Sequence, residues 1–452
     1  MIRGMTVPGE SDVAQLMGVR QAIDVIDAEP VTPRVERRRL HEAQGLRLAE
    51  DVAADRDYPP FDKSLMDGYA VRSADVKELP TVLRVVDVVP AGQWPRRAVA
   101  AGEAVAIMTG APMPEGADAV VPVEDVEETP EGVRVLRAEP TPGRHVARRG
   151  SDVPAGQRLL TRGTLLESPQ LAVAASVGLA NPQVYARPTV AVLGTGDEIV
   201  PVERTPGPAQ IRDSNTLMLA ALLARLGCAV RNLGTVQDDV TAMRAAFEEG
   251  LNADVLFVTG GMSMGTRDFV PGLLRDMGFQ TRIAKLRIKP GKPFVFAVRA
   301  GDDAGVAPAG TPQAGERTTP DFGGLGQFAS PQRTRYVFGL PGNPVSAFVC
   351  TLRLASRLLT RLAGGVPRER WLSGRIEVGM PPNGPREFYQ PVVRQVAAGI
   401  SSNQNELAAI RLLPWKGSAD LFTLAQANAL LVRPENEPPV AQGTLVRVLE
   451  IG

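Results

Sequence analysis

A short segment in the second half of the chain, residues 285–292, gathers four cationic side chains within eight residues. Side chains alternate between the two faces of a strand, so a strand here would present Lys285, Arg287 and Lys289 on one face. Lys292 follows a Pro-Gly turn. Such a concentration of positive charge suits an oxyanion or a phosphate group. The alternative interpretation is an exposed edge strand whose lysines discourage aggregation, and the pattern alone leaves both interpretations open.

Three predicted strands, 188–193, 228–233 and 254–259, each end in an acidic or glycine-rich loop. Because parallel strands deliver their carboxyl ends to one edge of a sheet, the loops predict a single site there. Glycines let backbone amides approach a phosphate, and carboxylates can hold Mg²⁺, although each acid could instead cap a helix. The candidate ligand-binding residues are Thr195, Gly196, Asp197, Gly260, Gly261, Ser263 and Gly265. The candidate metal ligands are Glu198, Asp238, Asp239 and Asp268.

A fourth loop follows the predicted strand 336–340 and begins a helix. It contains Pro341 and Gly342, then Asn343 in position to cap the helix and Pro344 in its first turn. The free amides of this turn and the hydroxyl of Ser346 could bind an anion. An ordinary strand-to-helix turn would have the same sequence. This loop therefore supports an anion-binding site only in combination with the other loops.

Competing motifs are incomplete. Residues 261–265 read G-x-S-x-G, as in the nucleophile elbow of hydrolases, but that mechanism needs a later histidine. Both histidines, His41 and His145, precede the serine. The loop after 188–193 has Ile199 where a dinucleotide-binding fingerprint needs its third glycine. The two cysteines exclude a disulfide scaffold and a cysteine-rich metal site.

The elements around these loops predict several domains. Strands alternate with helices from about 181, which predicts a doubly wound α/β domain with a parallel sheet. Residues 301–334 interrupt it with seven glycines and four prolines, and we expect a flexible insertion there. Short β runs separated by turns fill 51–144, and similar runs return after 370.

Composition excludes some partners. Lysine plus arginine and aspartate plus glutamate both number 50, so the chain as a whole has no attraction for nucleic acid or acidic membranes. The longest apolar stretch, 171–180, falls short of the ~18 residues that span a bilayer. The start of the chain has no apolar segment of signal-peptide type. We therefore expect a cytoplasmic protein with no membrane or nucleic-acid partner.

Seven segments, in this order, resemble the MoeA and gephyrin E-domain family of molybdopterin molybdenumtransferases. They are FDKSLMDGYAV at 61–71, IMTGAPMPEGADAVV at 107–121, TGDE at 195–198, IRDSN at 211–215, TGGMSMG at 259–265, KPGKP at 289–293 and LPGNPVSA at 340–347. The resemblance spans about 15–450 and implies a multi-domain α/β plus β fold. The implied domains are an elongated connector (8–50 and 145–180), a β-rich domain (51–144), a molybdopterin-binding α/β domain (181–365) and a C-terminal β-barrel (366–452).

The resemblance also implies a reaction and an assembly. Family members join molybdate to the dithiolene of adenylated molybdopterin and release AMP with the help of Mg²⁺. The implied site lies between two subunits of a homodimer, so the resemblance adds Asp62, Asp67 and Thr109 to Glu198, Asp268, Lys285 and Lys289 as catalytic residues. Lys292 and the three ligand-binding loops would hold the cofactor. Implied protein partners are a molybdopterin adenylyltransferase and the molybdoenzymes that accept the product.

Two other functions stay open. One is a gephyrin-like scaffold that anchors other proteins, although this chain lacks an attached adenylylating domain. The other is a molybdopterin adenylyltransferase, although such enzymes are typically a single α/β domain. The chain departs from the family pattern at Arg287, where a small or apolar residue is usual, at the pair Thr266-Arg267, and in the length of 301–334. Molybdate and tungstate have the same charge and shape, so the sequence does not separate them.

Overall fold

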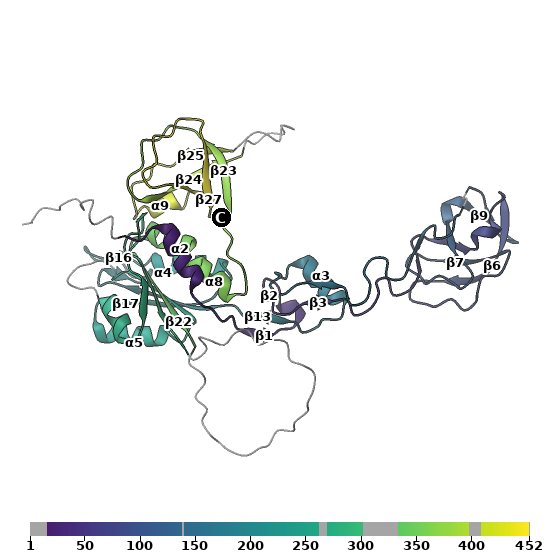
Figure 1. The fold of residues 1–452 in the computed structure, drawn as a ribbon, viewed down its shortest axis with the longest axis horizontal. Helices are drawn as coiled ribbons and strands as arrows, with labels where there is room; N and C mark the ends of the chain where they lie inside the picture. The colour runs from purple at the N-terminus through teal and green to yellow at the C-terminus, as the bar shows by residue number, and fades with distance from the viewer. Residues whose placement is uncertain (1–15, 138–139, 262–268, 302–332, 397–407, 452) are drawn as a thin grey trace, which may run out of the picture. The chain divides into compact units, whose positions relative to one another are not determined.

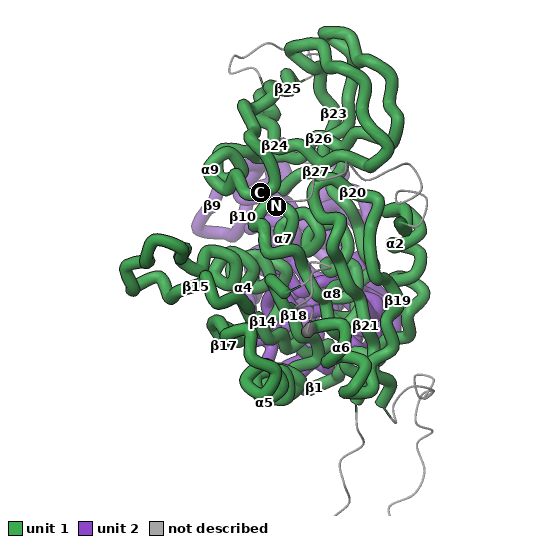
Figure 2. Tube along the Cα trace, turned by 90° about the vertical axis from the view of Figure 1, so that its left-hand side faces the viewer, with its two compact units in different colours: residues 1–36, 185–452 green, residues 37–184 purple. Residues whose placement is uncertain are grey.

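The computed structural model describes residues 16–137, 140–261, 269–301, 333–396 and 408–451. The chain divides into two compact units (Figure 2). The first unit combines Met1–Glu36 with Tyr185–Gly452, and the second is Arg37–Val184. The predicted flexible insertion lies almost wholly outside the described residues, between two strands that pair with each other. The prediction of its flexibility is therefore left as it stands.

The centre of the first unit is a six-stranded sheet in the order β17-β14-β18-β22-β21-β19. The first four strands are parallel, and β21 and β19 are antiparallel to their neighbours. The bounds are Ala229–Val236 (β17), Thr189–Thr195 (β14), Val255–Thr259 (β18), Arg335–Leu340 (β22), Val295–Arg299 (β21) and Gln280–Ile283 (β19). Because the parallel strands end at one edge, the loops after β14, β18 and β22 begin there.

Helices cover both faces of this sheet, which confirms the predicted doubly wound α/β domain. In β14, Val190 and Val192 point into one buried cluster, while Ala191 and Leu193 point into another. The first cluster includes α4 (Asn215–Arg225), α7 (Pro344–Cys350) and α8 (Ser356–Leu362). The second includes α5 (Val240–Gly250) and α6 (Phe269–Asp276). Strands buried on both faces explain the unbroken apolar runs in the sequence.

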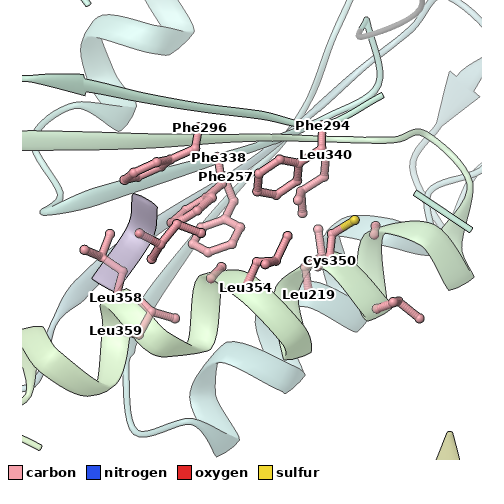
Figure 3. Close-up of a cluster of buried hydrophobic side chains, with 14 of the residues drawn as sticks. Leu219, Phe257, Phe294, Phe296, Phe338, Leu340, Cys350, Leu354, Leu358 and Leu359 are labelled. Atoms are coloured by element: carbon pink, nitrogen blue, oxygen red, sulfur yellow. The ribbon is translucent and has the colours of Figure 1, made fainter. Parts of the chain in front are cut away.

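Aromatic side chains fill the space between the sheet and α7–α8 (Figure 3). Phe338 of β22 lies between Phe257 and Phe296 of the neighbouring strands, with ring centroids 5.2 Å and 4.8 Å away. Leu354 and Leu358 of the helical layer face these rings. Each buried ring removes about 150–250 Å² of surface from water, so this layer fixes the strand ends firmly.

Helix α2 (Val19–Ala28) packs against the first unit, beside α8 (Figure 1). The family resemblance implies a connector domain that includes these residues, and this assignment stays a prediction. The structure buries the apolar face formed by Val19, Ala22, Ile23 and Ile26 in the cluster that also contains α8. Their three- and four-residue spacing gives one continuous stripe, which is stable only against another apolar surface.

The predicted C-terminal β-barrel is confirmed, with five strands. Their order is β24-β25-β23-β27-β26, and β26 pairs back to β24 and closes the ring. The bounds are Glu387–Gln395 (β24), Ala409–Leu412 (β25), Trp371–Ile376 (β23), Leu445–Glu450 (β27) and Ala429–Arg433 (β26). The short strand β20 (Ile288–Lys289) joins the outside of β24 in parallel, so the cationic segment is attached to the barrel.

The second unit is built from small β-sheets. The largest has six strands in the order β8-β5-β7-β6-β10-β9. Its strands are Ala119–Pro122 (β8), Gly68–Val71 (β5), Glu103–Ile107 (β7), Thr81–Val89 (β6), Gly132–Val135 (β10) and Val126–Thr129 (β9). A separate apolar cluster around Leu48, Leu166 and Val184 also contacts Leu171 of α3 (Ser168–Ser176). Among the described residues of the whole chain, no helix is both long and apolar enough to cross a membrane.

Candidate active site

A cavity of about 1270 Å³ opens in the first unit at the carboxyl edge of the sheet. The loops after β14, β18 and β22 form one wall, and the segment 289–293 forms a second. Residues of the barrel complete it, because β24 and the loop 415–419 also line the space. The cavity thus contains both the glycine-rich loops and the Pro-Gly-Lys turn that the sequence analysis expects in one site.

The structure brings ten of the predicted site residues to this cavity. They are Thr195, Glu198, Gly260, Lys289, Lys292, Pro341, Gly342, Asn343, Pro344 and Ser346. Six other described residues of the first unit do not line it: Lys285, Gly196, Asp197, Gly261, Asp238 and Asp239. Ser263, Gly265 and Asp268 lie outside the described residues. Asp62, Asp67 and Thr109 belong to the second unit.

Three buried polar atoms in the cavity wall have no hydrogen-bond partner within the described part of the chain. They are Oγ1 of Thr195, Oδ1 of Asn215 and Nε1 of Trp415. A buried polar atom without a partner costs about 1–3 kcal/mol, and folded proteins contain few of them. These three atoms are therefore available to hydrogen-bond a bound water or a polar ligand in the cavity.

The glycine at the end of β18 is required by the backbone around it. Gly260 has φ +97°, and a Cβ atom there would lie 2.4 Å from the carbonyl oxygen of Thr195. The neighbouring turn is in ordinary contact, since a Cβ on Gly342 would lie 3.7 Å from Cα of Gly260. Asn215 connects the same loops, because its Nδ2 donates to Oγ1 of Thr259 at 3.1 Å and to the carbonyl of Gly342. This wall is therefore shaped by the Gly260 backbone and by the Asn215 side chain.

Lys285, Arg287 and Lys289 lie on an extended segment that is not one continuous strand. Leu286 forms a parallel bridge with Met17, whose N–H donates to the carbonyl of Lys285 at 3.2 Å and whose carbonyl accepts from the Arg287 N–H at 2.8 Å. Strand β20 then begins at Ile288. Leu286 and Ile288 are buried and the three cationic residues are less buried, which is the alternation that the sequence predicts.

The four cationic side chains of residues 285–292 have different surroundings. Lys289 and Lys292 line the cavity, and Nζ of Lys289 lies 4.7 Å from the ring centroid of Phe388. Arg287 forms an ion pair with Glu435 at 3.0 Å. Since a cation over an aromatic face is attracted by the ring quadrupole, Phe388 holds the Lys289 ammonium in place.

The carboxylates expected to bind metal do not gather in the described residues, where no group of three or more histidine, cysteine, aspartate or glutamate side chains could hold an ion. Asp239 caps α5, its Oδ1 accepting from the Ala242 N–H at 2.8 Å. The Asp238 N–H donates to Oδ1 of Asp197 at 3.1 Å. Glu198 is the only one of the described candidates at the cavity.

In the second unit, Asp67 and Thr109 meet directly. The Thr109 N–H donates to Oδ1 of Asp67 at 2.7 Å, and the hydrogen bonds from Thr109 lower the pKa of this carboxyl. Asp62 accepts from the Arg149 N–H at 2.8 Å and from the Arg148 guanidinium at 2.6 Å. Partial burial raises the pKa of Asp62, but these two donors outweigh it and lower the pKa overall. Both aspartates thus favour the charged form.

Sequence reasoning missed the barrel side of the cavity. Its lining includes Arg386, Phe388, Trp415, Lys416 and Ser418. The Asn343 side chain donates to Oγ of Ser418 at 2.8 Å, and the Val345 N–H donates to the carbonyl of Ser418 at 3.1 Å, which attaches the loop to the start of α7. The available signal was the Pro-Trp-Lys-Gly-Ser run at 414–418, where aromatic, cationic and turn residues coincide.

The fold and cavity define a class of protein: a doubly wound α/β domain with a lysine-lined cavity at its carboxyl edge, completed by a β-barrel. Three family models match the chain in succession. They describe a MoeA N-terminal region (domain I and II) at 17–178, a probable molybdopterin binding domain at 191–361 and a MoeA C-terminal region (domain IV) at 373–451. The chain belongs to the MoeA family.

Individual relatives agree with this. A molybdopterin molybdenumtransferase from Nostoc sp. is 31% identical over 98% of this chain and 94% of its own length. Another from Synechococcus elongatus is 32% identical over 96% of this chain and 99% of its own length. The crystal structure of a molybdopterin biosynthesis MoeA protein from Pyrococcus horikosii superposes with a TM-score of 0.75 at 27% identity, covering 96% of this chain and 99% of that one.

Proposed function

We propose that this chain is a molybdopterin molybdenumtransferase, which inserts molybdate into adenylated molybdopterin and releases AMP to form the molybdenum cofactor. Relatives of that name match nearly its whole length. The observation that carries the proposal is the cavity itself, where Lys289 and Lys292 face a space also lined by the unpartnered atoms of Thr195, Asn215 and Trp415.

The cationic side of the cavity would bind molybdate. This anion is a tetrahedral dianion, and charge-assisted hydrogen bonds to it are about twice as strong as neutral ones. Lys289, Lys292, Arg386 and Lys416 all line the cavity, and the Ser418 hydroxyl adds a neutral donor. Lys285 is a weaker candidate than the sequence suggests, because it is not part of the lining.

The sheet side would bind the pterin and its phosphates. The backbone amides of Gly342 and Asn343 lie where α7 begins, and a helix N-terminus favours negative charge. The volume of about 1270 Å³ exceeds the ~300–1000 Å³ of ordinary small-molecule pockets, which suits a ligand as large as a nucleotide-linked pterin.

The reaction needs no nucleophile from the protein. The sulfurs that receive the metal belong to the substrate, and both cysteines are buried. Burial raises the pKa of the Cys228 thiol to about 12 and that of Cys350 still further. At neutral pH these thiols are protonated and cannot act as thiolates. The role of the protein is therefore to hold two anionic substrates together.

We also propose that Mg²⁺ assists the reaction. Magnesium usually keeps several waters and takes only one or two carboxylates together with substrate phosphates. Glu198 is the described residue that fits this role, and Asp268 is the second candidate from the sequence. The described residues alone do not form a complete metal site.

A homodimer in the cytoplasm completes the proposal. The family resemblance assigns Asp62, Asp67 and Thr109 to the site of a neighbouring subunit, and Asp67 and Thr109 are at least in contact with each other. Protein partners would be the adenylyltransferase that supplies the substrate and the enzymes that accept the product. Light scattering of the purified chain tests the dimer, since a monomer would leave these three residues without a role.

The decisive experiment incubates the protein with adenylated molybdopterin and molybdate, with and without Mg²⁺. We expect AMP release together with molybdenum bound to the pterin. Tight binding of the substrate without turnover would instead favour the scaffold function. Formation of adenylated molybdopterin from ATP and molybdopterin would favour the adenylyltransferase.

A further inference from the structure

Strand β24 presents different residues to its two sides. Phe388 and Gln390 of the strand line the cavity, together with Arg386 just before it, whereas Glu387 and Tyr389 between them do not. This alternation is the normal consequence of strand geometry, in which successive side chains point to opposite faces. One short stretch therefore forms part of the cavity wall while its other face packs elsewhere.

The other face of β24 enters a network of buried charges. The Tyr389 ring is fully buried, and its hydroxyl accepts from Nε of Arg353 at 2.7 Å and donates to the carboxylate of Glu387. Arg353 also pairs with Glu369, which accepts from the Trp371 indole N–H at 2.8 Å. The tyrosine hydroxyl thus donates along the strand and accepts from the helical layer.

The network continues to the helices of the α/β domain. Arg357 donates to Glu369 at 2.9 Å and forms a two-pronged pair with Asp27 of α2. Arg353 and Arg357 are only 11% and 15% exposed, so screening by solvent is weak. Buried networks of this kind define one arrangement of the elements they connect, because a shifted arrangement would leave a charge without a partner.

Strand β24 also determines the position of Lys289. It pairs with β20 so that Ile288 lies opposite Glu387 and Lys289 opposite Phe388. The Lys289 ammonium then lies over the Phe388 ring. Any movement of β24 along its axis would carry Arg386, Phe388 and Lys289 together. The cationic wall of the cavity and the buried network are therefore opposite sides of one structural element.

We infer that Tyr389, through its bonds to Arg353 and Glu387, is a positioning residue that sets the cationic wall of the cavity for its anionic ligand. This inference rests on the proposed function, in which that ligand is molybdate. Tyr389 touches no part of the cavity itself and acts only through β24. Its effect should consequently appear in anion affinity and in the order of β24, and much less in the chemical step.

The test replaces the hydroxyl alone. In Tyr389→Phe we expect the KM for molybdate to rise about fivefold, which corresponds to the loss of one buried hydrogen bond, while kcat at saturating molybdate stays within about twofold. Amide hydrogen exchange in the peptide 386–390 should become faster. Glu387→Gln removes the charge that Tyr389 donates to and should give the same pattern, which covers the case in which the first variant folds poorly.

A matched control is available in Tyr336→Phe. Tyr336 is also a buried tyrosine of the first unit, and its hydroxyl donates to the Pro30 carbonyl at 2.8 Å, away from β24. It should lose similar stability without any change in the molybdate KM or in exchange at 386–390. Wild-type KM and exchange in Tyr389→Phe would overturn the inference. Absence of AMP release by the wild-type protein would overturn the proposed function instead, and the exchange experiment would still decide the role of Tyr389.

Discussion

The sheet wall and the barrel wall of the cavity are held in place by different interactions. At the sheet, Gly260 approaches the Thr195 backbone closely, and the strands are fixed by a layer of buried aromatic rings. At the barrel, Phe388 and Lys289 depend on side-chain contacts, with a buried ionic network behind them. Backbone contacts tolerate almost no change, whereas a wall held by several side chains can lose one contact and retain the rest. We therefore expect substitutions at the sheet to act severely and substitutions at the barrel to act in graded steps.

The largest effect is expected for Gly260→Ala. The new methyl group would lie 2.4 Å from the Thr195 carbonyl oxygen in a residue with φ +97°, so the loop must move. We expect kcat/KM to fall ~100-fold, since a displacement of about 1 Å at a binding loop can cost that much. Stability should fall by ~1–3 kcal/mol. Steady-state kinetics and thermal unfolding measure both.

Gly227→Ala is the control for this variant. Gly227 also has a positive φ, +87°, but a Cβ atom there meets nothing within 4 Å. It should lose ~1 kcal/mol of stability from backbone strain and keep its activity. Equal kinetic losses in the two variants would show that strain, and not the shape of the sheet wall, determines activity.

The next effect compares two lysines of the cationic segment. Lys289→Ala should raise the KM for molybdate ~10–100-fold, because it removes a charge-assisted contact and leaves Phe388 without its cation. Lys285→Ala should change this KM by less than ~3-fold, because Lys285 does not line the cavity. The sequence pattern treats the two lysines as equivalent, and the structure does not. A loss in Lys285→Ala as large as that in Lys289→Ala would favour the sequence interpretation.

The α/β domain and its loops are the part of the molecule that the sequence predicts well. The α/β domain was predictable, because strands buried on both faces leave unbroken apolar runs that alternate with helical patterns. The glycine-rich loop after β18 and the Pro-Gly turn after β22 were predictable for a similar reason, since the position of a loop at the sheet edge follows from the strand order. A local sequence pattern therefore predicts where a residue lies when the backbone alone determines that position.

The barrel wall could not be predicted in this way. Lys285 does not line the cavity, and the extended backbone around it is bridged to Met17, more than 260 residues away. Trp415 reaches the cavity because Ser418 is bonded to Asn343 and Val345 at the start of α7. No local pattern records such partners. Asp239 illustrates the opposite error, because its local pattern allowed a metal ligand and a helix cap equally, and the structure shows the cap.

A smaller effect is expected at Asp420, which organises the loop that carries Trp415 and Lys416. Its carboxylate accepts from the Lys416 N–H and the Thr423 N–H at 3.0 Å each, and from the Thr423 hydroxyl at 2.7 Å. These bonds, the one from Lys416 first, lower its pKa below the ordinary value of 3.8. A carboxyl with a lowered pKa in the folded state adds stability above pH 3.8 and loses it as pH falls through the lowered value.

Asp420→Ala should therefore lower the melting temperature by ~1–2 °C at pH 7, and the difference from wild type should shrink at pH values below 3.8. The KM for molybdate should rise ~2–3-fold as the loop loosens. Thermal unfolding across pH 3–7 measures the first effect. A difference that grows toward low pH would contradict the proposed origin of the lowered pKa.

The smallest effect is expected for the ion pair between Arg287 and Glu435. These side chains are 33% and 30% exposed, and their atoms lie 3.0 Å apart. Pairs of this kind contribute ~0.2–1 kcal/mol, so Arg287→Ala should lower stability by no more than that. A double-mutant cycle with Glu435→Gln should return a coupling energy in the same range, and it should weaken in high salt.

The sequence pattern would make Arg287 an anion ligand, whereas its pairing makes it a support for β20 at the edge of the barrel wall. A 10-fold or larger rise in the molybdate KM of Arg287→Ala, with little change in stability, would return Arg287 to the anion site and show that the barrel wall extends beyond the cavity described above.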